Sequence, residues 1–462
     1  LASQLARQKL ELSAREDAIP VLVHAANLTQ FGDEDKLLAA VIKAVAVYSS
    51  PLSATRIPNF IQNIFNNGQA FLLIDGLDEL PPEELTAVNN YIWEILSDYP
   101  ATRIVVTADA NHIGNLPNMG FVSIPMAIWG TRQQAQFAKQ WGRVWNEFIE
   151  PQQNEESDSV SPLLLNGWLL NRHSALTPFE FTLQMWATYH GDVRGPSLAD
   201  AIEAYVRRTA AHIPNGIEAM ERFAGQVVLA QKSVIAFDEA QAWAKGLVPE
   251  DIGDEIVEEE EDAIEIGAPS EDTITDAENE TVDAEDAEDA EEILITDPPE
   301  EFTISRILPE LRRSGVMVAR VDDQMAFSRP IILGYLAGRN LTAANFDALF
   351  PLPDCQLKNL SLHFVASHHE ITPYANQLFS QADDPLYRGT IRIAHWLKGI
   401  PLDAAWRKII LGRLANFISD ESISLGARAR ILCGLAKTND PDIGTLFRHL
   451  LKSQKISVRQ LA

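Results

Sequence analysis

The chain has few cysteines and no long apolar run. Its two cysteines, Cys355 and Cys433, stand 78 positions apart, so neither a disulfide framework nor a cysteine metal site is expected. This use of cysteine indicates a reducing compartment, and we expect a cytoplasmic protein. No apolar run approaches the ~18–20 residues that a membrane-spanning helix needs. The sequence therefore predicts no membrane association.

Basic residues are absent from one long stretch, and this stretch accounts for the acidity of the chain. The 462 residues carry a formal charge of −28, with 37 Lys and Arg against 65 Asp and Glu. Residues 250–301 hold 25 Asp and Glu and no Lys or Arg. Such a composition buries too little apolar surface to offset its ordering entropy, so we predict a disordered acidic insertion. The remainder has a net charge of −3, which at the level of composition indicates neither a nucleic-acid partner nor a membrane surface.

The sequence also lacks a G-x-x-x-x-G-K-[ST] loop, the element that cradles nucleotide phosphates. The pattern that is present over residues 1–128 is that of an α/β domain. Short apolar runs predict strands and helical spacing predicts helices between them. We expect strands at 19–25, 71–75, 103–107 and 121–125, and helices at 1–12, 37–47 and 85–96. This alternation predicts a parallel sheet with crossover helices.

An acidic cluster follows the second of these strands. In the stretch FLLIDGLDEL the apolar run ends at Asp75, and Asp78 and Glu79 come shortly after it. Ligands bind at the carboxyl ends of parallel strands, where one acid can hold Mg²⁺ and another can orient an attacking water. The alternative is a strand-to-helix turn whose acids only cap the next helix. The motif by itself leaves both interpretations open.

Beyond residue 128 the pattern becomes helical, and the length of the chain predicts two to four domains. Residues 129–249 show helical spacing, and Pro178 after Thr177 is typical of a helix N1 position. Residues 302–341 predict a helix, a turn, a hairpin and a second helix. Residues 342–462 predict helices with short loops that resemble HEAT-type repeats, although their period is poorly defined.

The acidic cluster and the order of elements resemble one known family. Apolar residues followed by Asp-Gly-Leu-Asp-Glu-Leu are similar to the extended Walker B motif of the NACHT family of signalling NTPases. The segments of the family also occur in the family's order. They are a strand IPVLV at 19–23, the Walker B strand at 71–79, a sensor strand RIVVT at 103–107 and the segment GTRQQAQFAKQWGRVW at 130–145. The resemblance implies a P-loop NTPase-type parallel sheet (1–128) that lacks its first strand and P-loop. An all-α helical lid (129–249), a winged helix (302–341) and HEAT-like repeats (342–462) would follow.

The resemblance implies ATP or ADP with Mg²⁺ as cofactors and assigns roles to six residues. Asp75 would bind Mg²⁺, and Asp78 and Glu79 would position the attacking water. Thr107 would contact the end of the nucleotide, Pro178 would pack on the adenine, and Arg329 would bind a phosphate. Asp109 stands where the family has a sensor Arg, and an acid there would repel phosphate. Arg329 stands where relatives have a His that touches the β-phosphate, and its guanidinium can still bind phosphate.

The implied function is a nucleotide-dependent signal-transduction switch that senses protein partners through its C-terminal helices and forms a ligand-induced homo-oligomer. The resemblance places Leu1 just after a P-loop, so these 462 residues alone are expected to have no ATPase activity. The alternative is a catalytically degenerate scaffold that keeps the architecture for protein binding. An intact P-loop upstream of Leu1 would favour the switch, and a loop poor in Gly and Lys would favour the scaffold.

Overall fold

The computed structural model describes residues 18–29, 37–109, 112–149, 176–190, 198–244, 304–341, 345–380, 386–436, 438 and 441–461. The helix expected at 1–12 and the acidic insertion expected at 250–301 lie outside these residues. None of the helices in the described ranges combines the length and the apolarity that crossing a membrane requires.

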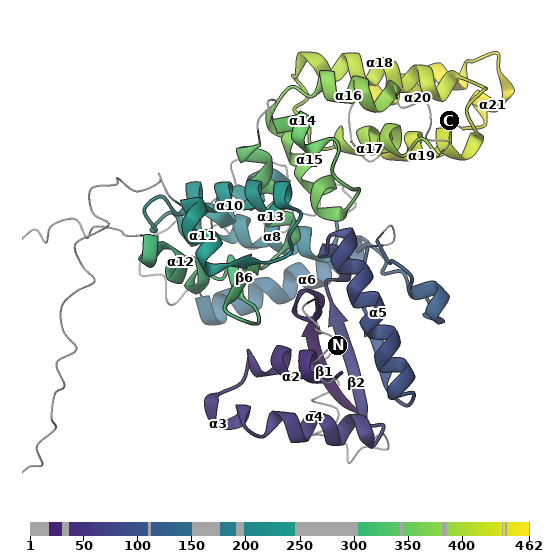
Figure 1. Ribbon diagram of the computed structural model, residues 1–462. Coiled ribbons are helices and arrows are strands. Elements are labelled where there is room, and N and C mark those ends of the chain that lie inside the picture. Colours follow the sequence, from purple (N-terminus) through teal and green to yellow (C-terminus); the bar gives the residue numbers. More distant parts are fainter. Residues whose placement is uncertain are drawn as a thin grey trace, which may run out of the picture.

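A three-stranded parallel sheet forms the N-terminal part, which confirms the predicted α/β character (Figure 1). The strands β1 (Ile19–His24), β2 (Ala70–Asp75) and β3 (Arg103–Val106) lie in the order β1-β2-β3. Each is a short apolar run, and parallel strands of this kind are buried on at least one face. The three predicted strands at these positions are therefore confirmed.

The fourth predicted strand, at 121–125, is wrong. These residues form no strand, and Val122 and Ile124 are each 85% exposed. In the described part of the chain β3 pairs with β2 alone, so no strand lies beyond β3 to receive another in parallel. An apolar alternating sequence becomes a strand only when a neighbouring strand supplies hydrogen bonds.

One face of the sheet carries the N-terminal core. The side chains of alternate residues, Val21 and Val23 on β1 and Leu72 and Ile74 on β2, are buried in one cluster. The same cluster contains residues of helices α2 (Ala39–Ala46), α4 (Ile57–Asn66) and α5 (Pro82–Asp98). On the opposite face Leu22 is 54% exposed. A short helix, α3 (Pro51–Ala54), joins α2 to α4.

Helices and a small antiparallel sheet form the middle of the chain. The helices are α6 (Thr131–Val144), α8 (Pro178–Tyr189), α9 (Leu198–Ala210), α10 (Gly216–Ala230), α11 (Phe237–Ala244), α12 (Ile304–Arg313) and α13 (Pro330–Asn340). The predicted order of helix, hairpin and helix over 302–341 is present, with strands β5 (Met317–Ala319) and β6 (Gln324–Phe327) between α12 and α13. A further strand, β4 (Ile235–Ala236), pairs with β6 and completes a sheet of order β4-β6-β5.

The C-terminal part is helical, as predicted, and all but its first two helices lie in two rows in Figure 1. They are α14 (Phe346–Leu349), α15 (Gln356–His368), α16 (Thr372–Ser380), α17 (Arg388–Trp396), α18 (Ala405–Ser419), α19 (Leu425–Ala436), α20 (Pro441–Leu451) and α21 (Ile456–Arg459). One hydrophobic core runs from Leu183 in α8 to Val458 in α21. The helices from α9 onward and part of α8 thus share a core, whereas α6 packs with Phe181 and Met185 of α8 in a separate cluster.

Candidate functional site

The carboxyl ends of the three parallel strands bring Asp75 and Thr107 together. Asp75 ends β2, and Thr107 follows β3 in the neighbouring position. The Thr107 hydroxyl donates to Asp75 Oδ1 at 2.5 Å and accepts from the backbone N–H of Gly76 at 3.0 Å. The parallel register therefore places two of the predicted site residues in direct contact.

Gly76 allows the acidic turn to fold back over the sheet edge. Its φ is +76°, in the left-handed region, and a Cβ at this position would lie 2.6 Å from His24 Nε2. Only glycine adopts this conformation without steric cost, and no larger residue fits so close to the histidine. The following 3-10 turn, Leu77–Glu79, is thereby held against β1 and carries the remaining acids of the cluster.

His24, the last residue of β1, positions the Glu79 carboxylate. His24 Nε2 lies 3.2 Å from Glu79 Oε2, and His24 Nδ1 accepts from the backbone N–H of Ala26 at 3.2 Å. Because Nδ1 is an acceptor, the proton of the neutral ring is on Nε2 and points at the carboxylate. The histidine thus orients Glu79 through its ring Nε2.

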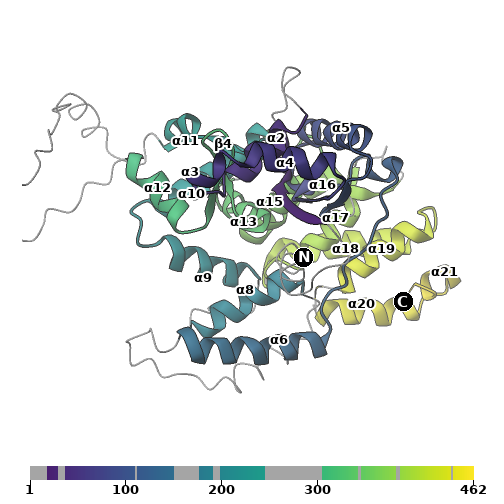
Figure 2. The same cartoon turned by 90° about the horizontal axis from the view of Figure 1, so that it is seen from below.

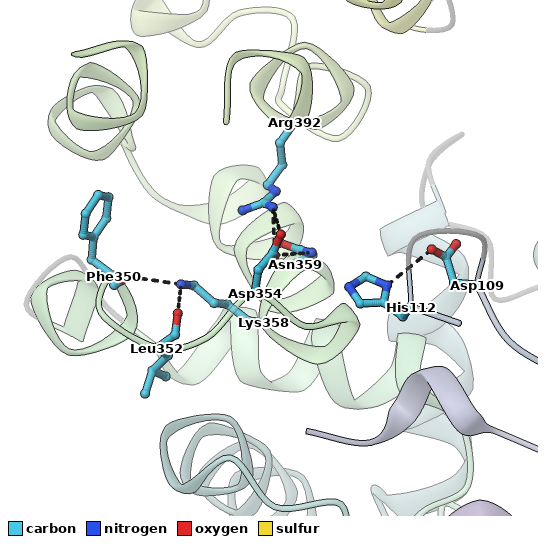
Figure 3. A network of polar contacts seen from close by, with 8 residues as sticks. All are labelled: Asp109, His112, Phe350, Leu352, Asp354, Lys358, Asn359 and Arg392. Atoms are coloured by element: carbon cyan, nitrogen blue, oxygen red, sulfur yellow. Dashed lines mark hydrogen bonds and ion pairs between the residues drawn. The ribbon is translucent and has the colours of Figure 1, made fainter. Parts of the chain in front are cut away.

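Asp78 faces the C-terminal helices. Burial raises the pKa of its carboxyl group, and the nearby charges of Glu79 and Asp109 raise it further, whereas hydrogen bonds from the backbone and from Gln356 oppose the rise. Gln356 is the first residue of α15. Asp109 lies 3.3 Å from His112 Nδ1, and both residues lie beside α15 in Figure 3. The acidic turn is therefore a junction between the parallel sheet and α15.

Buried polar contacts hold the beginning of α15. The ammonium group of Lys358, a residue only 5% exposed, donates to the carbonyl oxygens of Phe350 at 3.1 Å and Leu352 at 2.6 Å (Figure 3). Burial lowers the pKa of this lysine. Arg392 on α17 donates to both carboxylate oxygens of Asp354 at 2.8 Å. The helix end that meets Asp78 is thus tied to the next helices of the C-terminal part.

A cavity of about 20 Å³ lies next to Glu79, which is room for about one water molecule. The cavity lies where the sheet edge meets strand β6 of the hairpin and α13. Its lining consists of Glu79, Lys232, Ser233, Phe327, Pro330, Leu333 and Leu357. Two polar members of the lining already have partners, since Lys232 pairs with Glu239 and Ser233 donates to Glu84.

Pro178 and Arg329 form a second group. Pro178 is the N1 residue of α8, after a Thr177 cap whose hydroxyl accepts from the N–H of Glu180 at 3.2 Å. The Arg329 guanidinium lies over the ring of Phe179, 5.6 Å from its centroid. Arg329 immediately precedes Pro330, which lines the cavity at Glu79. The predicted phosphate residue therefore contacts the residue that follows the predicted lid proline, and α13 alone of their two helices lines the cavity at the acidic edge.

The groups at this edge that could bind a metal ion are carboxylates, and each already contacts another side chain of the protein. Asp75 binds Thr107, and Glu79 binds His24. Among the described residues no group of three or more His, Cys, Asp or Glu side chains is arranged to hold a metal ion. Mg²⁺ in phosphate-transfer sites is commonly held by one or two carboxylates, with phosphates and waters completing the octahedron. Asp75 fits that role, since its second oxygen has no hydrogen bond to any residue that the structure describes.

Three contributors were missed by the sequence analysis. His24 lies within a predicted strand and ends the observed one, and its pairing with Asp75 in the register is the signal that could have identified it. Lys232, in the loop after α10, and Gln356, at the start of α15, reach the acidic turn from far along the chain, and no local pattern marks them.

Comparison with known proteins identified no relative of the chain. No protein-family model matches the chain, and no curated protein sequence matches it. A functional assignment therefore depends on the residues and contacts described above.

Proposed function

We propose that the chain acts in an ATP- and Mg²⁺-dependent signal-transduction switch of the NACHT type. One observation carries the proposal. The carboxyl ends of three parallel strands gather His24, Asp75 and Thr107, and the acidic turn with Asp78 and Glu79 packs between this edge and the later helices. In open parallel sheets this edge is where ligands bind.

The residues divide the work as follows. Asp75 holds Mg²⁺, which when bound neutralises charge on the phosphate oxygens. Glu79, held by the Nε2–H of His24, accepts a hydrogen bond from the attacking water, and the adjoining cavity has room for one such molecule. Thr107 keeps Asp75 in place through its hydroxyl group. Asp78 assists Glu79 and links the site to α15.

The proposal accounts for the contact between the acidic edge and the helical parts. Phe327 and Pro330 line the cavity beside Glu79, and Gln356 hydrogen-bonds Asp78. A change in the ligand at the edge would therefore alter the packing of α13 and α15. In the proposed switch these helices relay the nucleotide state, in a cytoplasmic protein, to C-terminal helices that bind a protein partner and promote homo-oligomerisation.

A scaffold without catalysis is the second candidate, and Asp109 favours it. This carboxylate raises the pKa of Asp78 and lies where the resembled family has a phosphate-binding Arg. A second negative charge at the edge opposes phosphate binding. In the scaffold, the hydrogen bonds of Asp75 and Glu79 would serve only to hold the turn.

Nucleotide binding by variants separates the two candidates. The proposed switch needs a phosphate-binding loop that these 462 residues do not contain, so the measurement uses these residues joined to a segment that supplies one. Asp75→Ala should abolish Mg²⁺-dependent retention of ATP, whereas Glu79→Gln should retain ATP and slow its hydrolysis, as expected of a water-positioning group. Glu83→Gln, at an exposed acid in the first turn of α5, is the matched control and should change neither.

Equal binding and turnover in all of these proteins would eliminate the switch and leave the scaffold. The 462 residues alone provide a further check, because they lack the Gly and Lys residues of a phosphate cradle. Calorimetry should detect no micromolar affinity for ATP in this chain.

A further inference from the structure

The near-neutral folded composition hides an uneven distribution of charge. Residues 386–462 contain 13 Lys and Arg and 5 Asp and Glu, a net charge of +8. The chain outside these residues and outside 250–301 contains 24 basic and 35 acidic residues, a net charge of −11. An overall count averages these two parts, so the C-terminal helices are more basic than the composition indicates.

The basic side chains are exposed on three helices at the C-terminal end of the chain, of which α21 contacts α20. We name as the C-terminal basic surface the exposed Lys and Arg of α18, α20, α21 and the loop before α21: Lys408, Arg413, Arg448, Lys452, Lys455 and Arg459. Lys455 Nζ donates to the carbonyl oxygen of Ser419 at 3.2 Å, which joins the beginning of α21 to the end of α18. Figures 1 and 2 show these helices at the C-terminal end of the chain. Lys455 is also 3.9 Å from Glu421. Lys408 and Lys452 form no ion pair with any residue in the described ranges.

Exposed aliphatic side chains are interspersed with these cations. Ile409 and Leu451 are each 53% exposed and Ile456 is 64% exposed. Each is directly adjacent in sequence to a lysine of the surface, in the pairs Lys408-Ile409, Leu451-Lys452 and Lys455-Ile456. Apolar side chains within a charged surface gain stability when a partner covers them.

The aliphatic residues distinguish between classes of anionic partner. A nucleic-acid backbone offers phosphates to the cations but no apolar groups that would cover isoleucine or leucine. Single strands bind through aromatic side chains that stack on bases, and every Phe, Tyr and Trp in the described part of 386–461 is at least partly buried. An acidic polypeptide with aliphatic side chains matches both features of the surface.

We propose that the C-terminal basic surface binds an acidic polypeptide segment in which aliphatic residues are interspersed with Asp and Glu. The carboxylates pair with Lys408, Lys452 and their neighbours, and the aliphatic side chains cover Ile409 and Leu451. This inference names the chemistry of the partner that the proposed function assigns to the C-terminal helices. Its test needs no nucleotide, so a failure of the inference is distinguishable from a failure of the switch.

A fluorescent peptide of about twenty residues, alternating Glu or Asp with Leu, Ile or Ala, serves as the probe, and its anisotropy measures binding. We expect micromolar affinity that weakens at least ~10-fold between about 50 mM and about 500 mM NaCl. K408E/K452E should weaken binding at least ~10-fold by charge reversal, and I409S/L451S should do so by loss of apolar cover. Lys43→Glu, at an exposed lysine on α2, is the matched control and should leave the affinity unchanged.

The measurement is made on the intact chain and on a chain without residues 254–292, whose carboxylates could compete with the probe. Binding in either protein, with the expected effects of the substitutions, supports the inference. Equal affinity for a peptide with Ser in place of every aliphatic residue would overturn it, as would tighter binding of a DNA duplex of equal charge. Absence of binding in both proteins, with unchanged circular dichroism spectra of the variants, would overturn it as well.

Discussion

Replacing Gly338 by Ala should destabilise the protein, because α13 and α15 pack in direct backbone contact at this residue. A Cβ at position 338 would lie 2.6 Å from Phe364 Cβ, and 2.8 Å from both the Phe364 carbonyl carbon and the Val365 backbone nitrogen. Two of these three atoms belong to the backbone of α15 and cannot rotate away. The two helices must therefore separate, which disturbs the core that they share.

A matched substitution isolates the cost of this overlap. Gly412 lies within α18, and a Cβ there would meet no atom within 4 Å. Gly→Ala in a helix interior gains about 1 kcal/mol from propensity, so Gly412→Ala should stabilise the protein by about that amount. Gly338→Ala has the same gain but an overpacking cost of about 1–3 kcal/mol. The two variants should therefore differ by about 1–3 kcal/mol in the free energy of unfolding.

Thermal melting followed by circular dichroism measures the difference. For a cooperative unit of about 200 residues, 1 kcal/mol corresponds to roughly 2–4 °C in Tm. Gly338→Ala should melt several degrees below Gly412→Ala, and urea midpoints should rank the variants in the same order. Equal or higher stability of Gly338→Ala would show that α13 and α15 are not in close contact, and the relay from the acidic turn through α15 would then lose its structural basis.

Three further predictions follow from single features of the chain. Because the folded-state pKa of Asp78 is raised, ionising this acid costs stability as the pH rises through that pKa; Asp78→Asn should be more stable than the wild type at pH 7 in urea titrations, and the difference should shrink as the pH is lowered toward 4. Lys358→Met leaves two buried carbonyl groups without their donor and should cost about 2–4 kcal/mol, whereas Lys398→Met, at an exposed lysine, should cost under about 0.5 kcal/mol; equal costs would contradict the buried hydrogen bonds. Deleting Asp254 to Glu292 should shift Tm by less than about 2 °C, since loop closure changes by only about 0.6 kcal/mol per doubling of length; a loss of many degrees would show that the segment packs on the fold.

Local sequence was sufficient to predict the elements of the sheet and the position of its acids. The apolar runs that became β1, β2 and β3 are contiguous, so their strand character depends on residues next to one another. The turn after Asp75 was equally local, because Gly76 supplies the left-handed conformation that the chain needs at that residue. The order of helix, hairpin and helix before residue 341 followed from the same kind of short-range pattern.

The tertiary structure alone decided which side chains meet at the candidate site. Residues 121–125 have a strand-like sequence, but in the described part of the chain no strand lies beside them to pair with. The contact of Asp78 with Gln356 and the cavity shared by Glu79 and Pro330 depend on how α13 and α15 pack on the sheet edge. The sequence by itself determines local conformation through neighbouring residues, whereas these contacts join residues far apart in the chain and depend on the packing of the whole core.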